Sequence, residues 1–506
     1  MKILFVYPKY PDTFWSFKHA LKLIWKKASF PPLGLLTIAA MLPEEWEKKL
    51  VDLNVHNISD EQIKWADYVF ISAMSIQKDS AREVVARCNR AGTKVVVGGP
   101  LFTTEYEEFK GIDHFVIGEA ESILPVLVTD LKNGCAKRIY TASEYVDITE
   151  TPIPLWSLIK MEDYTTMNLQ YSRGCPFDCE FCEIVFLNGH IPRTKSRSQM
   201  LAELEALYDS DWRGPVFIVD DNFIGNKQKL KQEILPALID WMREKRHPFS
   251  FTTETSINLS DDEELMELMV TAGFVRVFVG IESPSEESLS ECNKVQNKNR
   301  DLVTAVKKIQ NRGLEVMGGF ILGFDSDPLS IFKTQINFIQ SSGIVTAMVG
   351  LLNAPNGTRL YQRLKQEKRL VNTFSGDNTD FSLNFIPRMD KDTLVKGYMQ
   401  VLNTIYSPRQ YYERARTFLK EYRPPKRKQV NHLKPYQVFG GINIIWTLGF
   451  KDKGCWHYWK FLISNFFKNP RSTPISIELA VYGYHFRKVA EQYIKGQERL
   501  SNKFSE

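Results

Sequence analysis

Short apolar runs alternate with helix-like segments through most of the chain, in two separate series. The apolar runs of the first series end in Gly or Ser turns, and helix-like segments such as Asp79–Gly92 separate them. These runs are Lys2–Pro8, Tyr68–Met74, Lys94–Pro100 and His114–Glu121. This alternation predicts a parallel sheet with helices on both faces. An open sheet of this kind holds its ligand at the carboxyl ends of its strands, which is where the Gly-rich turns fall. We therefore expect an α/β, Rossmann-like (flavodoxin-like) domain over residues 1–145.

A linker over residues 146–166, marked by two prolines, separates this domain from the second series. Six further runs follow, beginning at Met167, Pro215, Phe249, Val275, Glu315 and Thr346. Six strand–helix units are too few for an eight-fold barrel, so we expect a partial TIM-type (β/α)6 barrel over residues 167–390. Within it, Ser260–Gly273 predicts a helix with Ser260 as N-cap and Glu263 completing a capping box, closed by Gly273.

The alternation stops beyond residue 390, and residues 391–506 predict a mainly helical region that begins with a helix over Tyr398–Leu419. A basic, Pro-containing patch follows; its charged residues are Arg423, Lys426, Arg427, Lys428 and Lys434. The run Trp456–Phe467 is rich in aromatic residues. Basic residues near aromatic residues are typical of a segment that lies on an anionic membrane. The same aromatic residues would also suit the core of a helical cap, and both interpretations stay open.

Composition narrows the class of protein. The 506 residues carry a net charge of +5, too small to indicate a nucleic-acid partner. The opening Met1–Tyr10 lacks the pattern of a signal peptide. The longest uncharged run, Thr334–Thr358, is interrupted by Gln, Asn, Gly and Pro and makes a poor membrane span. Four of the seven cysteines are scattered singly, which does not indicate a disulfide framework. We expect a reducing, cytoplasmic location.

The other three cysteines, Cys175, Cys179 and Cys182, lie within eight residues. Thiolates clustered at such short spacing select zinc or an iron–sulfur cluster. His190 is a candidate fourth ligand, so a Cys3His zinc site, or a non-enzymatic iron–sulfur or zinc sensor, stays open from these residues.

The spacing C-x3-C-x2-C, directly after a predicted strand and with Phe181 before the last cysteine, resembles the radical S-adenosylmethionine (SAM) superfamily. The resemblance implies that Cys175, Cys179 and Cys182 bind three irons of a [4Fe–4S] cluster and that the fourth iron chelates SAM. It also implies SAM contacts near the strand ends, at Phe181, Asp220, Asp221, Asn222, Glu254, Glu282, Gly318 and Gly319. The usual Gly-Gly-Glu motif is absent, and Val219–Asn226 occupies its place.

Segments of the first series resemble the cobalamin-binding domain that precedes the barrel in many radical SAM enzymes. The resemblance implies cobalamin contacts at Pro32, Gly34, Ser72, Ser75, Gly98, Gly99 and Gly118. The motif Asp-x-His-x-x-Gly, which supplies an axial histidine in other cobalamin proteins, is absent, because Asp52 and His56 have a different spacing. We therefore expect cobalamin with no protein histidine on cobalt. The alternative is a domain of this fold that has lost its ligand.

Over residues 1–420 the sequence resembles the hopanoid C-2 methylase group, through stretches such as Phe14–Pro43, Ser172–Ile184 and Ala347–Tyr361. The resemblance implies a cobalamin-dependent radical SAM methyltransferase that acts on an unactivated carbon of a small molecule or lipid. A 5′-deoxyadenosyl radical would abstract hydrogen, and methylcobalamin would deliver the methyl group. It also implies an electron donor of the flavodoxin or ferredoxin type. Radical cyclisation on the same architecture is the enzymatic alternative, and no general acid or base is assigned.

Overall fold

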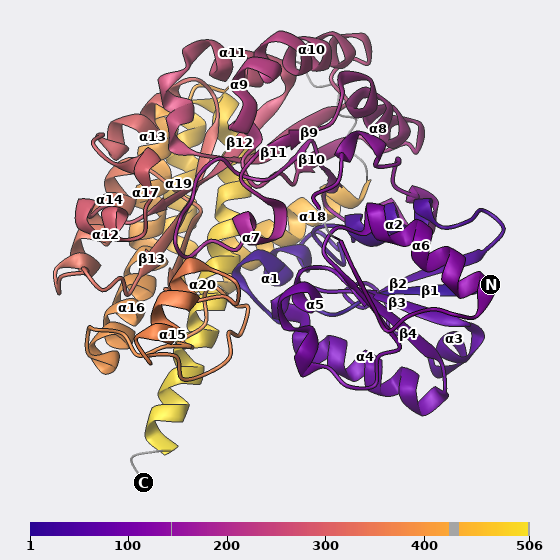
Figure 1. The fold of residues 1–506 in the computed structure, drawn as a ribbon. Coiled ribbons are helices and arrows are strands. Elements are labelled where there is room, and N and C mark those ends of the chain that lie inside the picture. The colour runs from indigo at the N-terminus through magenta and orange to yellow at the C-terminus, as the bar shows by residue number, and fades with distance from the viewer. Residues whose placement is uncertain (143, 425–434, 504–506) are drawn as a thin grey trace.

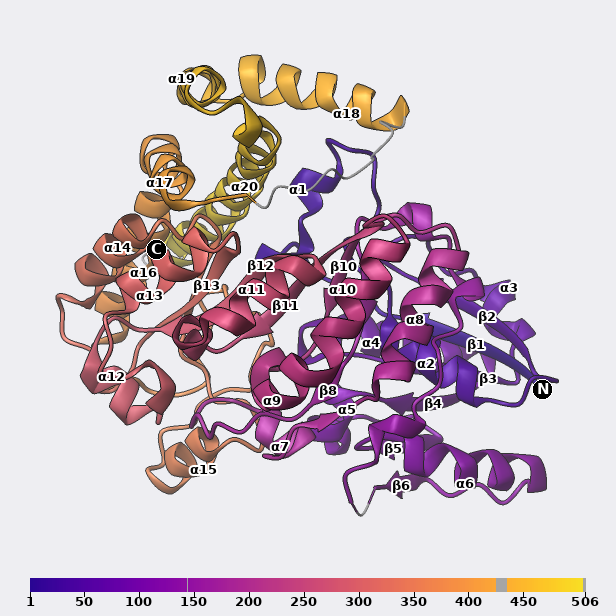
Figure 2. The ribbon, with the colours of Figure 1, turned by 90° about the horizontal axis from the view of Figure 1, so that it is seen from above.

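The computed structural model describes residues 1–142, 144–424 and 435–503. An amino-terminal α/β domain lies beside a second, larger α/β unit, and the carboxyl-terminal helices pack along that larger unit (Figure 1). Seen from above, α18 (Pro435–Trp446) extends over α1 (Lys18–Leu21) at one border of the molecule (Figure 2).

The amino-terminal sheet has six parallel strands in the order β2-β1-β3-β4-β5-β6. They are β1 (Lys2–Tyr7), β2 (Glu47–Asp52), β3 (Tyr68–Ser72), β4 (Lys94–Gly98), β5 (His114–Ile117) and β6 (Ile139–Thr141). The order is that of a flavodoxin-like sheet, whose ligand lies where the strand order reverses, between β1 and β3. The four predicted strands are confirmed. The sequence missed β2 and β6, because edge strands that are charged or only three residues long carry little apolar signal.

Helices cover both faces of this sheet, as predicted. One face packs against α2 (Leu33–Met41) and α6 (Ala120–Asn133). The other packs against α3 (Asp60–Trp65), α4 (Lys78–Ala91) and α5 (Pro100–Glu105). The two apolar layers place the strand ends, rather than the faces of the sheet, against the rest of the protein.

The second sheet has six parallel strands in the order β14-β13-β12-β11-β10-β7 and forms the predicted partial barrel. They are β7 (Met167–Leu169), β10 (Gly214–Ile218), β11 (Phe249–Thr255), β12 (Phe274–Glu282), β13 (Glu315–Leu322) and β14 (Ala347–Leu351). Helices follow the strands on the outer face, and the main ones are α8 (Arg197–Asp209), α10 (Leu235–Glu244), α11 (Glu263–Ala272), α13 (Leu302–Asn311) and α14 (Ile331–Ser342). Side chains alternate along β11, so that Phe251 is buried while Thr252 faces a cavity.

Two predicted helix boundaries are wrong. The N-cap of α11 is Asp262 and not Ser260, because the Asp262 side chain accepts a hydrogen bond from the Leu265 amide. Ser260 lies in a preceding 3-10 turn, and Gly273 closes the helix as predicted.

The single helix expected over Tyr398–Leu419 is two helices, α16 (Lys391–Ile405) and α17 (Pro408–Glu421). Pro408 starts α17 because it lacks the amide hydrogen that a helix interior requires.

The carboxyl-terminal region is helical, as predicted, and continues with α18, α19 (Cys455–Lys468) and α20 (Thr473–Lys503). Helix α20 returns to the amino terminus, where the ring of Phe486 stacks on Phe14 at 4.1 Å. Within the described ranges, no helix has both the length and the apolar content needed to cross a membrane. Of the predicted basic patch, Arg423 is described, while Lys426, Arg427, Lys428 and Lys434 lie outside the described residues.

Candidate active site

A cavity of about 2890 Å³ lies between the amino-terminal domain and the concave face of the partial barrel. Residues from both parts line it, for example Tyr7, Ser72 and Gly99 on one side and Phe217, Glu254 and Phe278 on the other. Ordinary ligand pockets reach about 1000 Å³, so this space has room for more than one large ligand.

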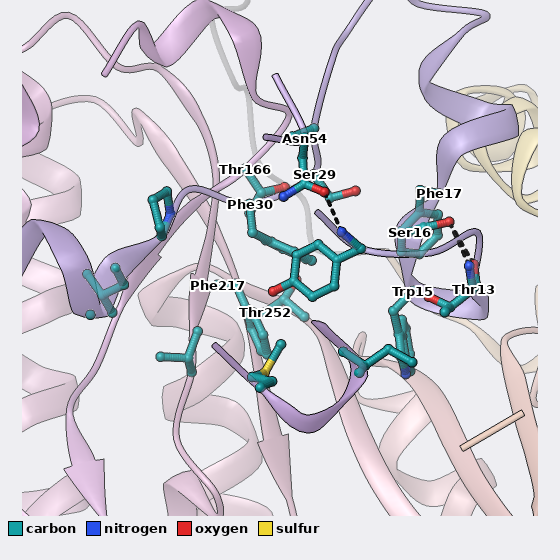
Figure 3. A pocket seen from close by; sticks show the side chains of 18 of the residues that line it. Thr13, Trp15, Ser16, Phe17, Ser29, Phe30, Asn54, Thr166, Phe217 and Thr252 are labelled. Atoms are coloured by element: carbon teal, nitrogen blue, oxygen red, sulfur yellow. Dashed lines mark hydrogen bonds between the residues drawn. The ribbon is translucent and has the colours of Figure 1, made fainter. Parts of the chain in front are cut away.

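Aromatic side chains from the two parts meet across the middle of the cavity (Figure 3). The rings of Phe30 and Phe217 are 5.5 Å apart, and those of Trp15 and Phe278 are 5.6 Å apart. The indole Nε1 of Trp15 also donates to the sulfur of Met348 on β14 at 3.0 Å. These contacts form an aromatic chamber, defined by Trp15, Phe30, Phe217 and Phe278, whose walls suit an apolar ligand.

The cysteine loop joins β8 (Ser172–Arg173) to α7 (Ile184–Asn188) at one end of the cavity, where Phe181 and Cys182 line the wall. Ion pairs hold it to α15 (Arg359–Gln366): Arg363 lies 2.8 Å from Glu180, and Arg359 lies 3.1 Å from Asp178. The acidic residues between the cysteines therefore anchor the loop. Sequence reasoning missed α15 as their partner, because it lies more than 170 residues further along the chain.

The ammonium group of Lys294 acts electrostatically on all three thiols. Burial raises the pKa of Cys175, Cys179 and Cys182, and Lys294 opposes this rise at each of them. Lys294 Nζ also lies 2.7 Å from Glu282 Oε1. A Cβ atom on Gly280 would come within 2.8 Å of Lys294 Nζ, so the glycine leaves room for this ion pair in its present position. The predicted SAM contact Glu282 is thus held by a lysine that the sequence analysis did not identify.

The three polar residues that follow β10 have different surroundings. Asp221 lines the cavity and accepts hydrogen bonds from the Gly174 amide at 3.1 Å and from Asn188 Nδ2 at 2.9 Å. Asp220 and Asn222 are buried and are not among the lining residues. Asp220 accepts from the Tyr171 amide at 2.7 Å, and Asn222 accepts from the Ser256 amide at 3.2 Å. Both therefore fasten neighbouring strand ends, and of the three only Asp221 is exposed to a ligand in the cavity.

Glu254 on β11 faces the cavity beside these carboxyl groups. Burial, together with Asp221 and Asp220, raises the pKa of Glu254 to about 8, so it holds a proton at neutral pH. On β13, Gly319 lines the cavity and Gly318 does not. A Cβ atom on Gly319 would come within 2.8 Å of the Phe278 ring, so this glycine lets the chamber wall pack against the strand.

On the amino-terminal side, six of the seven predicted contacts line the cavity, namely Pro32, Gly34, Ser72, Ser75, Gly99 and Gly118. Gly98 lies behind the wall, against Val116. A Cβ atom built on Gly34 would meet nothing within 4 Å, so an open cradle lies beside α2. Gly99 has φ +90, and a Cβ atom there would come within 2.6 Å of Ser72 Oγ. His56 lies outside this wall, 3.5 Å from Asp163.

Comparison with known proteins gives three consecutive matches to family models. Residues 27–128 match the B12 binding domain, residues 169–338 the radical SAM superfamily, and residues 358–499 a domain of unknown function.

Two relatives extend over almost the entire chain. An uncharacterized methyltransferase of Synechocystis sp. is 40% identical over 99% of this chain and 94% of its own length. The hopanoid C-2 methylase of Rhodopseudomonas palustris is 31% identical over 99% of this chain and 96% of its own. The chain belongs to the cobalamin-dependent radical SAM methyltransferases.

The fold of this methyltransferase agrees with solved structures. The radical SAM methyltransferase TsrM of Kitasatospora setae superposes with a TM-score of 0.64 at 15% identity, over 97% of this chain and 99% of that one. The radical SAM enzyme OxsB superposes with a TM-score of 0.62 at 15% identity, over 99% and 81% of the two chains. The cofactors of the methyltransferase are a [4Fe–4S] cluster, SAM and cobalamin.

The residues present fit these cofactors. Cys175, Cys179 and Cys182 would hold the cluster, because they are free thiols in one short loop at one end of the cavity and the cation Lys294 favours their thiolate form. His190, the fourth ligand that a Cys3His zinc site would need, is exposed and is not among the residues that line the cavity. The cradle beside Gly34 fits a large planar group, and no histidine is among the described residues that line the cavity.

Proposed function

We propose that this methyltransferase transfers a methyl group to an unactivated carbon of a polycyclic lipid of the hopanoid type. The single observation that carries the proposal is the aromatic chamber, which gives a rigid apolar surface next to the cofactor sites. The relative in Rhodopseudomonas palustris, named a hopanoid C-2 methylase, supports this substrate class because the similarity extends over nearly the whole of both chains.

The protein contributes alignment and the exclusion of water. When bound, the cluster and SAM supply hydrogen-atom abstraction from the substrate, and cobalamin supplies the methyl group. The rings of Trp15, Phe30, Phe217 and Phe278 would hold the fused rings of the lipid by apolar contact. Asp221, Glu254 and the Glu282–Lys294 pair would bind the polar groups of SAM. No side chain is assigned as general acid or base.

The proposal also covers the cellular location of the enzyme and its electron donor. We expect a cytoplasmic location, with contact to the inner face of the membrane that holds the lipid, and a flavodoxin or ferredoxin as electron donor. A low-potential donor would be required because reductive cleavage of SAM needs an electron, and the sequence has no second cysteine cluster that could carry it.

An anaerobic assay tests the substrate. Cofactor-loaded enzyme would be incubated with SAM, a low-potential reductant and a hopanoid dissolved in detergent, and the product would be analysed by mass spectrometry. We expect a lipid heavier by one CH2 group and no product with Cys182→Ala. Phe217→Trp, which fills the chamber, should slow methylation by about tenfold while the enzyme still cleaves SAM. A product that has lost hydrogen would indicate cyclisation, and an unmodified lipid would overturn the proposed substrate.

A further inference from the structure

Helix α18 exposes an apolar face. Phe439, Ile442 and Trp446 are 57%, 60% and 54% exposed, and their spacing of three and four residues places them on one side of the helix. The opposite side is buried through Ile444 and, just beyond the helix, Leu448. Isolated exposed apolar residues are ordinary, but a contiguous stripe marks an interaction surface.

Neighbouring residues extend this stripe. The ring of Trp25, which follows α1 and is also exposed, lies 6.3 Å from the Phe439 ring. At the other end, the Phe450 ring lies 5.7 Å from the Trp446 ring. We call the resulting surface the apolar face; it consists of Trp25, Phe439, Ile442, Ile445, Trp446 and Phe450. Helix α19, beside it, exposes a second apolar stripe through Trp456, Ile463 and Phe467.

The surroundings of the apolar face are positively charged. Five exposed cations lie along the segment that contains α19, namely Lys451, Lys453, Lys460, Lys468 and Arg471. Between Tyr422 and Ile477 the sequence has one acidic residue, Asp452. Asp452 is shielded from solvent by its ion pair with Arg487. The exposed charge along this segment is therefore of one sign, which complements anionic lipid headgroups.

The cavity extends to the underside of the apolar face. Its lining includes Ile24 and Trp25 next to α1, Gly441 and Ile444 on α18, and Ile477 on α20. A hydrogen bond from Asn443 Nδ2 on α18 to the Leu23 carbonyl, at 3.1 Å, holds the helix to this border. In Figure 2, α18 lies over α1, away from the barrel strands. Trp25 thus belongs both to the apolar face and to the lining of the cavity that contains the aromatic chamber.

We propose that the apolar face docks on an anionic bilayer and that the lipid substrate passes from the bilayer into the cavity between α1 and α18. Exposed tryptophans flanked by lysines are the side chains that settle at a bilayer surface, and each cation near it adds about 1 kcal/mol. The proposal deepens the proposed function and rests on it for the identity of the lipid. It also gives a role to the region that matches a domain of unknown function.

Vesicle co-sedimentation of the cofactor-loaded enzyme tests the docking. We expect binding to phosphatidylcholine vesicles that contain phosphatidylglycerol, at least about tenfold weaker binding without the anionic lipid, and weakening by salt. The double variant Ile442→Glu, Trp446→Glu should lose binding by about tenfold or more, because two charges would enter the interface. The matched control Leu329→Glu changes a side chain that is 72% exposed in the turn before α14 and should bind as wild type does.

Unfolding midpoints measured in parallel establish that the double variant is folded. Ile442 and Trp446 do not line the cavity, so the double variant should methylate lipid in detergent at the wild-type rate. Its rate with lipid in vesicles should fall by about tenfold. Equal vesicle binding by wild type and the double variant would overturn the docking. So would a dimer that the two substitutions dissociate, since the apolar face would then be covered by a second copy. Vesicle binding without methylation of any lipid would instead leave the docking in place and overturn the proposed substrate.

Discussion

Arg173 Nη2 lies 2.6 Å from Glu121 Oε1, and this ion pair joins the strand just before the cysteine loop to the amino-terminal domain. Arg173 Nη1 also lies 2.9 Å from Glu119, which in turn pairs with Arg193 at 2.8 Å. The segment Gly118–Glu121 therefore has two roles. Gly118 lines the cavity, and the two glutamates clamp the amino-terminal domain against the part of the barrel that carries the thiols.

The first prediction concerns this clamp. Burial would raise the pKa of Glu121, but Arg173 outweighs burial and lowers it. The pair therefore stabilises the fold above the unfolded-state pKa of about 4.3, and the effect is lost as pH falls through the lower pKa of the folded state. Glu121→Gln should destabilise the protein by about 1–3 kcal/mol at pH 7 in urea unfolding, and this difference should shrink below pH 4. Glu45→Gln, which breaks an exposed pair with Lys132, should leave the midpoint unchanged. A clamp variant as stable as wild type would show that the domains are held by other contacts.

The second prediction concerns the cluster. Replacing Cys175, Cys179 and Cys182 together with alanine should abolish the brown absorbance and SAM cleavage, whereas anaerobically reconstituted wild type should hold about four irons. Cys135→Ala removes an exposed thiol elsewhere and should retain the full iron content. Iron analysis and the visible spectrum measure both. A triple variant with a full cluster, or a wild type that holds zinc alone, would contradict the assignment.

The third prediction concerns the cobalamin cradle. Gly34→Leu places a side chain in the open space beside α2, so the affinity for cobalamin should fall by about tenfold or more. Glycine inside a helix costs about 1 kcal/mol relative to alanine, so the apoprotein should unfold at the same or a higher temperature. Gly496→Leu, at an equally open position on α20, should bind cobalamin as wild type does. Spectroscopic titration with cobalamin gives both affinities, and an unchanged affinity in Gly34→Leu would place the cofactor elsewhere.

The fourth prediction concerns pH. His485 on α20 is buried with Nε2 2.9 Å from the Phe14 carbonyl oxygen, and burial lowers its pKa to about 4. The unfolded chain therefore binds a proton that the folded protein excludes between pH 6.5 and 4. Stability should fall in that window as pH falls, by on the order of 3 kcal/mol. In His485→Gln this contribution should be absent, while His190→Gln, at an exposed position, should keep the wild-type profile. Identical pH profiles for wild type and His485→Gln would contradict the prediction.

The sequence alone determined the two α/β units and the position of the cysteine loop. Both are local properties: buried parallel strands read as apolar runs such as Lys94–Pro100, and the three thiols occupy a single short segment. The sequence did not predict the edge strand β2, because its charged residues reach solvent and leave little apolar signal. The predicted start of α11 was wrong because Ser260 and Asp262 are both acceptable N-cap residues. The bounds of the linker and domains remain predictions.

Only the tertiary structure decided which residues act together. It brought Lys294 to Glu282 and the thiols, paired Arg173 with Glu121 across 52 positions, and placed α20 against Phe14 from the opposite end of the chain. It also separated Asp221, which faces the cavity, from Asp220, which is buried beneath it. Adjacent residues on a strand end point in opposite directions, and a buried charge must find its counter-charge wherever packing brings one close. These outcomes depend on how the two sheets meet, which no local pattern in the sequence records.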